Sequence, residues 1–355
     1  MINKNIRIRA GIVTYNSANH IEACLKSLYQ QSIIPDIRVF DNASSDDTVN
    51  KIRKLFPEVT VNASSENLGF GKGHNFLLND WDFDYYLLLN PDVELESKCL
   101  ENLLREIQIK NERCGANPVV YYKQGSTLSK NVYSCGHIIY RDRRVEDLGI
   151  GQYDYKPQRN DLFGVNGACA LLSAKALKSI SYSDGPFDTD FFLYGEDDDL
   201  NWRLALAGWQ SILADKAIAW HEAGASDGFR SYRVRVNSLS NRWLTILKND
   251  HPILFLRNIF WIFSFELVYW VTRIIRRPFF ICELLSAHVR FLCLAPKFIR
   301  KRSKTIRNIS LKMESSLFEK GMADRIRILT DRLNKKSNHK SLWTKAENQK
   351  NVVNN

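Results

Sequence analysis

Short apolar runs alternate with amphipathic segments over residues 6–110 of the chain. The apolar runs predict strands over 6–16, 36–44, 58–64 and 85–92. Between the first two runs, apolar residues recur at spacings of three and four, which predicts a helix over 17–31, and a second helix opens at Ser45. Strands that alternate with helices of this length indicate an α/β fold class, a mostly parallel sheet with helices on both faces.

The pattern is less regular over residues 111–195. We predict a strand over 115–122, a loop-rich region over 124–157, and a strand that leads into a helix over 163–177. A further helix opens with four consecutive acids within 192–209, and a last strand over 211–224 contains His221 near its end. This pattern predicts a globular domain over residues 1–240.

The basic residues of this 355-residue chain are concentrated in its last third. The net charge is +11, and residues 251–355 carry 21 Lys and Arg against 7 Asp and Glu. The positive charge therefore belongs to the tail, and the anionic partner that it implies should bind there. Seven scattered cysteines without a C-x-x-C pair suit a reducing compartment, and the N-terminus has no signal-peptide pattern.

Polar residues follow the predicted strands where each strand ends. They are Asn16, Asp41, Asn67 and Asp92. Because the carboxyl ends of parallel strands meet at one edge of a sheet, we expect these residues to converge on a ligand. Asp92 follows a buried apolar run, and a carboxylate there is suited to a hard divalent cation. Asn-Pro-Asp is also a common turn that caps the next helix.

Three other segments carry candidate chemistry. His221 is either a structural histidine or a ligand for Mn²⁺. In the acidic run 196–199, Asp199 can form an ion pair with Arg203 at i+4 of a helix. The alternative interpretation is a general base, because neighbouring carboxylates raise one another's pKa. The glycine-rich segment 67–75 lacks the dinucleotide fingerprint because His74 occupies the place of the third glycine, but its amides and Lys72 could cradle a diphosphate.

Taken in order, seven motifs over about 230 residues resemble the family 2 glycosyltransferases of bacteria, especially the rhamnosyltransferase-like members. The motifs are VTYN, FDNASSDDT, NLGFGKGHN, LLLNPDVEL, NGACALLSAKAL, FFLYGEDDDLNWRLALAGW and HEAGAS. The resemblance implies a GT-A fold, a nucleotide-sugar donor, and transfer with inversion at the anomeric carbon.

The resemblance also implies roles for individual residues on the donor side. Thr14, Tyr15 and Asn16 should border the nucleotide, and Asp41 should contact its base or ribose. The residues expected to line the pyrophosphate and sugar are Asn67, Gly69, Phe70 and Lys72.

The metal and the base are implied in the same way. Asn90 stands where the family often has the first acid of Asp-x-Asp, and Asp92 is the expected ligand for Mg²⁺ or Mn²⁺, with His221 as a further ligand. Asp197 is the preferred general base, with Glu196 as the alternative.

The region 241–334 is amphipathic and basic. Arg257 and Glu266 interrupt its apolar run, so we expect a poor bilayer span. On a helix, Glu266 shares a face with two arginines and lies opposite Val268, which predicts helices in the membrane interface with basic residues toward anionic headgroups. The alternative is that these helices pack on the catalytic domain or form a homodimer seam. Residues 335–355 have a composition typical of disorder.

These features together predict a peripheral enzyme at the cytoplasmic face of a bacterial inner membrane. The resemblance implies transfer of L-rhamnose from dTDP-rhamnose to a polyprenyl-diphosphate-linked saccharide, in the synthesis of O-antigen, capsule or cell wall. A UDP- or GDP-sugar donor, or a non-catalytic nucleotide-sugar-binding relative, is the alternative. Nucleotidyl transfer is disfavoured because no Gly-rich phosphate loop with Arg follows the first strand, and the aromatic tail suits lipid better than nucleic acid.

Overall fold

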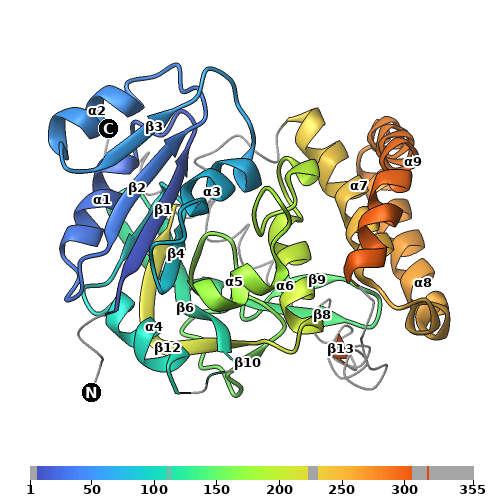
Figure 1. Ribbon diagram of the computed structural model, residues 1–355. Coiled ribbons are helices and arrows are strands. Elements are labelled where there is room, and N and C mark those ends of the chain that lie inside the picture. Colours follow the sequence, from blue (N-terminus) through green and yellow to red (C-terminus); the bar gives the residue numbers. More distant parts are fainter. Residues whose placement is uncertain (1–5, 110, 112, 223–230, 306–317, 320–355) are drawn as a thin grey trace, which may run out of the picture. The chain divides into compact units, whose positions relative to one another are not determined.

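A mixed ten-stranded sheet forms the centre of the computed structural model (Figure 1), which describes residues 6–109, 111, 113–222, 231–305 and 318–319. The strand order is β10-β12-β6-β11-β4-β1-β2-β3, with β5 beside β12 and β7 beside β6. The first half of the chain supplies β1 (Ile8–Thr14), β2 (Asp36–Asp41), β3 (Thr60–Ala63), β4 (Tyr85–Leu89) and β5 (Val93–Leu95). Its helices are α1 (Ile21–Tyr29), α2 (Thr48–Leu55), α3 (Phe70–Leu78) and α4 (Cys99–Ile107).

Side-chain alternation along the buried strands explains why helices cover both faces. In β4, Leu87 and Leu89 pack in one core with α1, α2 and α4, whereas Tyr86 and Leu88 pack in a second core with α3 and helices of the later chain. Successive residues of a strand point to opposite faces, so a continuous apolar run needs cover on both. Because β1 pairs in parallel with β2 and β4, the ends of these strands share one edge. The predicted α/β fold class is confirmed.

The later chain contributes antiparallel strands where the sequence predicted loops. The region 124–157 contains β7 (Thr127–Ser134), β8 (His137–Tyr140) and β9 (Val145–Asp147), so the prediction of a loop-rich region is wrong. β8 and β9 form a separate hairpin. The remaining elements of this part are β6 (Arg113–Gln124), β10 (Asp161–Leu162), β11 (Cys169–Ser173), α5 (Ala174–Ile180), the 3-10 turn η1 (Thr189–Phe191), α6 (Glu196–Leu206) and β12 (Gln210–His221).

Three helices follow the sheet and gather beyond α6 (Figure 1). They are α7 (Tyr232–Asn249), α8 (Pro252–Arg276) and α9 (Phe280–Thr305), and the short strand β13 (Phe318–Glu319) comes last. The predicted domain boundary at residue 240 falls inside α7. Phe298 of α9 packs with Phe191 of η1 and Leu244 of α7, so α9 shares a core with the preceding part of the chain. The region predicted to be disordered, 335–355, lies outside the described residues.

The two faces of α8 differ in what they contact. Glu266 is only 3% exposed and pairs with Arg242 of α7 through its Oε1, 2.6 Å from the Arg242 Nε. The opposite face exposes Val268, Val271 and Ile275. The predicted division of this helix into two faces is therefore present, but its acidic residue points toward the protein and its apolar face points outward. By length and a mean hydropathy of 1.4, α8 also meets the requirements of a membrane span.

Candidate active site

A large cavity of about 1740 Å³ lies where the strand ends meet the later helices. Most of the residues predicted from the sequence line it, namely Thr14, Tyr15, Asn16, Asn67, Gly69, Phe70, Asn90, Asp92, Glu196 and Asp197. Asp41, Lys72 and His221 are not in the lining. Residues of α7, α8 and α9 line the same cavity, among them Trp243, Phe263 and Phe291. The cavity exceeds the roughly 300–1,000 Å³ of an ordinary small-molecule pocket.

Asp41 is enclosed by its neighbours at the end of β2. Its Oδ1 accepts hydrogen bonds from the hydroxyls of Thr14, at 2.7 Å, and Ser44, at 2.6 Å, and its Oδ2 accepts from the Ser44 amide. Ser44 Oγ in turn accepts a hydrogen bond from the amide of Asn16, whose φ is 50°. In this structure Asp41 therefore fixes the loop that carries Asn16, which lines the cavity itself.

The glycine-rich segment forms the first turn of α3 and packs closely. A Cβ on Gly69, which has φ +85°, would lie 2.3 Å from the carbonyl oxygen of Phe192, and a Cβ on Gly73 would lie 2.8 Å from Val13. The amide of Phe70 donates to that same Phe192 oxygen at 3.1 Å. The glycines thus allow α3 to approach both the sheet and the loop before α6, and only Gly69 and Phe70 of this turn reach the cavity.

Asp92 and His221 lie side by side at the edge of the sheet. Pairing of β5 with β12 sets His221 opposite Val93, next to Asp92 in the chain, and Nε2 of His221 is 3.1 Å from Oδ1 of Asp92. Two ligands at adjacent octahedral positions around Mg²⁺ are separated by about 3 Å. The ring of Tyr133 packs edge-on against His221, and the buried Nδ1 of His221 has no hydrogen-bond partner among the described residues.

This pair fits a divalent cation as a partial site. Carboxylate oxygen and imidazole nitrogen are both ligands of Mn²⁺. No group of three or more His, Cys, Asp or Glu suited to a metal occurs within the described ranges, so these residues offer at most two such ligands. Cations of this kind commonly complete their coordination with substrate phosphates and water.

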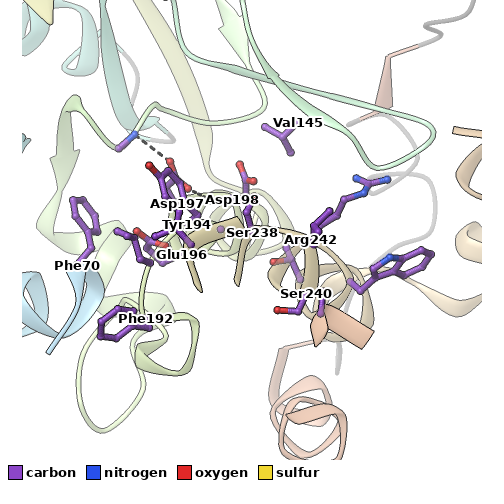
Figure 2. A pocket seen from close by; sticks show the side chains of 18 of the residues that line it. Phe70, Val145, Phe192, Tyr194, Glu196, Asp197, Asp198, Ser238, Ser240 and Arg242 are labelled. Atoms are coloured by element: carbon purple, nitrogen blue, oxygen red, sulfur yellow. Dashed lines mark hydrogen bonds between the residues drawn. The ribbon is translucent and has the colours of Figure 1, made fainter. Parts of the chain in front are cut away.

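The acids of α6 begin directly after Gly195, whose φ is 92°. Figure 2 shows Glu196, Asp197 and Asp198 together, with Phe70 and Phe192 on one side and Arg242 on the other. The two oxygens of Asp197 accept hydrogen bonds from the amides of Asp198, at 2.9 Å, and Gly167, at 3.3 Å. Glu196 is buried, and its Oε2 has no partner among the described residues.

The two candidate bases differ in their acidity. Burial and the neighbouring charge of Asp198 raise the pKa of Asp197 from 3.8 to about 6, while the nearby His137 opposes the rise. Burial and Asp197 raise the pKa of Glu196 well above its ordinary value. A carboxylate with a pKa near 6 is mostly ionised at neutral pH and accepts a proton efficiently. Asp197 is therefore better suited than Glu196 to act as a base.

His137 belongs to this site and was missed from the sequence. It begins β8, is 6% exposed, and lines the cavity. Its Nδ1 lies 3.3 Å from Oδ1 of Asp198, and its Nε2 lies 3.4 Å from Oδ1 of Asp147 in β9. No local sequence pattern indicates this cluster, because its residues come from a region that we interpreted as loops and from a distant helix.

Asp199 anchors α6 to the rest of the protein. Its Oδ2 lies 2.9 Å from Nε of Arg203, which confirms the predicted i, i+4 pair. The buried Lys248 of α7 lies 2.8 Å from Asp199 and 2.6 Å from Asp188. The amide of Asn249 also donates to Asp199, at 2.8 Å. This network fixes the helix that presents Glu196 and Asp197.

Comparisons with known proteins agree with this geometry. The model of the family described as glycosyl transferase family 2 matches residues 10–181, which carry the strand-end residues up to Asp92. Two curated proteins from Mycobacterium tuberculosis, strains CDC 1551 and H37Rv, are 26% identical to this chain over 238 residues. Both are named N-acetylglucosaminyl-diphospho-decaprenol L-rhamnosyltransferase, and the match covers 61% of this chain and 76% of theirs.

The fold has counterparts among solved structures. The structure of GalNAc-T7 with UDP, GalNAc and Mn²⁺ superposes with a TM-score of 0.55 at 12% sequence identity. The match covers 69% of this chain and about half of that protein, 48%, and at this identity it shows the fold alone. Residues 10–181 are therefore a glycosyl transferase family 2 region, and together with the related rhamnosyltransferases and the shared fold they identify this protein as a glycosyltransferase with the GT-A fold.

Proposed function

We propose that this enzyme transfers L-rhamnose from dTDP-rhamnose, with inversion, to a saccharide linked to polyprenyl diphosphate in the synthesis of a bacterial surface polysaccharide. One observation carries the proposal: Asp92 at the strand ends and Asp197 on α6 line a single cavity. A donor diphosphate near Asp92 and an acceptor hydroxyl near Asp197 would then meet across the transferred sugar. The rhamnosyl donor and lipid-linked acceptor follow the printed names of the 26% identical relatives.

The chain's own residues suggest the chemical step. Asp197 accepts the proton of the acceptor hydroxyl while the hydroxyl oxygen bonds to the anomeric carbon. The bond from that carbon to the diphosphate oxygen breaks on the opposite face, and the nucleoside diphosphate leaves with the electron pair. A single displacement inverts the anomeric centre and needs no covalent intermediate, unlike a retaining mechanism. The amides of Gly167 and Asp198 orient the carboxylate for this role.

The residues at the strand ends of the cavity are proposed to bind the nucleotide-sugar donor. Thr14, Tyr15 and Asn16 border the nucleotide, and Asn67, Gly69 and Phe70 lie along the diphosphate and sugar. Asp92 and His221 would hold Mg²⁺ or Mn²⁺, which neutralises charge on the departing diphosphate when bound. Because Asn90 is neutral where the family often has an acid, the cation site carries less negative charge. Asp41 acts from outside the cavity lining, through Thr14 and Ser44, whereas Lys72 is an exposed residue of α3 outside the lining.

The outer face of α8 and α9 supports a lipid acceptor. Exposed apolar residues continue from α8 through the turn into α9, including Ile275 near the end of α8 and Phe279 in the turn, which are 75% and 84% exposed. Phe263 is exposed and also lines the catalytic cavity, so an apolar surface leads from outside toward Asp197. Leu254, Ile262 and Glu266 of α8 are buried against the protein, which favours a helix lying in the interface over one surrounded by lipid. The active site would then face the cytoplasmic leaflet.

Ligand-induced stabilisation tests the donor and the base together. We expect dTDP and dTDP-rhamnose to raise the melting temperature of the full-length protein in the presence of Mn²⁺ or Mg²⁺. Asp197→Asn should keep this shift and lose transfer by about 10²- to 10⁴-fold, because only proton removal is affected. Asp184→Asn, an exposed acid outside the cavity lining, is the control.

The outcomes separate the alternatives. A preference for UDP or GDP would keep the mechanism and change the donor. No stabilisation by any nucleotide would favour a non-catalytic relative, and full transfer by Asp197→Asn would remove this residue from the mechanism.

Vesicle flotation tests the membrane surface. We expect full-length protein to float with vesicles that contain anionic phospholipid, and the double substitution Ile275→Asp with Phe279→Asp to abolish flotation, since it places charge on the apolar face. Ile34→Asp changes another exposed apolar residue, 61% exposed and outside these helices, and should leave flotation intact. Wild-type protein that stays in solution as a dimer would instead identify this face as a homodimer seam.

A further inference from the structure

His137 is held rigidly at the start of β8. Its backbone amide donates to the Gly164 carbonyl at 2.8 Å, and its carbonyl accepts from the Phe163 amide at 2.9 Å. The ring is buried between the β8–β9 hairpin and α6. Both ring nitrogens face carboxylates, Asp147 on one side and Asp198 on the other.

A charged imidazole satisfies both carboxylates. A neutral imidazole has one N–H donor, whereas the imidazolium has two. Two side-chain amides also approach the ring, but both have better partners. The Asn166 amide donates to Asp147 at 2.7 Å, and the Asn201 amide donates to the Val165 carbonyl at 2.8 Å. The surroundings therefore favour a positive charge on His137.

The same cluster holds the proposed base. The Asp198 residue that faces His137 also donates its backbone amide to Oδ1 of Asp197. Asn166, which bonds Asp147, directly precedes Gly167, whose amide donates to Oδ2 of Asp197. Asp198 therefore contacts His137 and Asp197 directly, and Asp147 is connected to Asp197 through Asn166 and the adjacent Gly167 amide. Figure 2 shows Asp197 and Asp198 adjacent at the beginning of α6.

The acids around Asp197 need a counter-charge. Asp198 and Asp147 both lie near it, and negative neighbours favour the protonated form of a carboxyl. Burial opposes a charge on His137, but its hydrogen bonds to Asp147 and Asp198 outweigh this and raise its pKa well above 6.5. The His137 charge lowers the pKa of Asp197, while Asp147 and Asp198 raise it.

We propose that His137 is a positioning residue that, as an imidazolium between Asp147 and Asp198, sets both the orientation and the charge of the Asp197 carboxylate. This inference rests on the proposed role of Asp197 as the base. It assigns to the β8–β9 hairpin a part in catalysis that neither the relatives nor the sequence motifs indicate. A purely structural role for His137, tying the hairpin to α6, is the competing explanation.

The pH dependence of kcat in the full-length enzyme separates the two explanations. His137→Gln keeps a hydrogen-bond donor and removes the charge. We expect the acid limb of the profile to move to higher pH, with a loss of about tenfold at pH 6.5 and a much smaller loss at high pH, where Asp197 ionises in both proteins. A uniform loss at every pH, or an unchanged profile, would overturn the proposal.

A second substitution tests the charge balance. In His137→Gln with Asp147→Asn, one positive and one negative charge are removed together, so the acid limb should return toward the wild-type position. If the residues only tie the hairpin to α6, the double variant should be at least as impaired as the single one. Thermal unfolding of both variants identifies any loss that comes from misfolding.

A measurement without turnover keeps this test separate from the proposed function. In ¹⁵N-histidine-labelled protein, one ring should carry two N–H protons at pH 8, and His137→Gln should remove that signal. A neutral His137 ring at pH 7 would overturn the inference even if Asp197 is the base. A charged His137 together with full activity of Asp197→Asn would instead contradict the proposed mechanism.

Discussion

Two histidines of this enzyme lie against aspartates, and their second ring nitrogens distinguish them. His221 faces Asp92 through Nε2, and its Nδ1 has no hydrogen-bond partner among the described residues. His137 faces a carboxylate with each nitrogen. In the first arrangement, Oδ1 of Asp92 has no hydrogen-bond partner among the described residues and is open to a cation together with Nε2 of His221, whereas both ring nitrogens of His137 already face carboxylates. An adjacent Asp and His are therefore not enough to predict a metal site.

The largest expected difference is between removal of the carboxylate beside His221 and removal of one beside His137. Asp92→Asn should weaken cation binding and lower transfer by about 100-fold or more, because loss of even an outer partner of a metal ligand costs about 10- to 100-fold. Asp147→Asn removes the same charge beside His137 and should leave the Mn²⁺ concentration for half-maximal activity unchanged. Titration of activity with Mn²⁺ at fixed donor concentration measures both.

The distinction between the two histidines is wrong if Asp92→Asn and Asp147→Asn change the Mn²⁺ requirement equally. An equal rise in the Mn²⁺ requirement for Asp147→Asn would place the cation near His137. An unchanged requirement for Asp92→Asn would remove Asp92 from the cation site.

A smaller effect is expected on the free energy of unfolding, because the folded protein disfavours the ionised form of Asp197. Its pKa of about 6 in the folded protein lies above the ordinary 3.8, so between these values the unfolded chain loses the proton first. The folded state is therefore destabilised as pH rises from about 4 to 6, and the full cost remains above that range. Asp197→Asn should raise the free energy of unfolding at pH 7.5 by about 1–3 kcal/mol.

Urea denaturation at several pH values measures this difference. The gain from Asp197→Asn should shrink toward pH 5, where wild-type Asp197 is mostly protonated. Asp184→Asn should show no such trend. A variant that is less stable than wild type at pH 7.5 would mean that the amide contacts of the carboxylate outweigh its burial.

The sequence predicted which strand-end residues line the cavity in most cases, because that information is local. A buried apolar run followed by Asp92, or by Asn16 after β1, places a polar residue at the strand end whatever happens elsewhere. The Asp199–Arg203 pair was predictable for the same reason, since helical geometry brings i and i+4 together. The two sides of α8 were also correctly separated, although periodicity alone could not say which side faces the protein.

The residues that were missed depend on contacts between distant segments. β7, β8 and β9 are short and partly polar, and their pairing is decided by the hairpin and by β6 rather than by an apolar pattern. His137 meets Asp198 only after that hairpin folds onto α6. Lys248 likewise reaches Asp188 and Asp199 from α7. Local patterns cannot show such contacts.

The shared use of Asp188 has a consequence for how such enzymes diversify. This buried carboxylate binds Lys248 of α7 and Lys301 of α9, and Phe298 of α9 enters the core around Phe191. The C-terminal helices are thus not an interchangeable anchor attached to an independent enzyme. Exchanging them between relatives should succeed only when α7 and the loop around Asp188 are exchanged with them, so that the apolar surface of α8 and α9 is inherited together with α6.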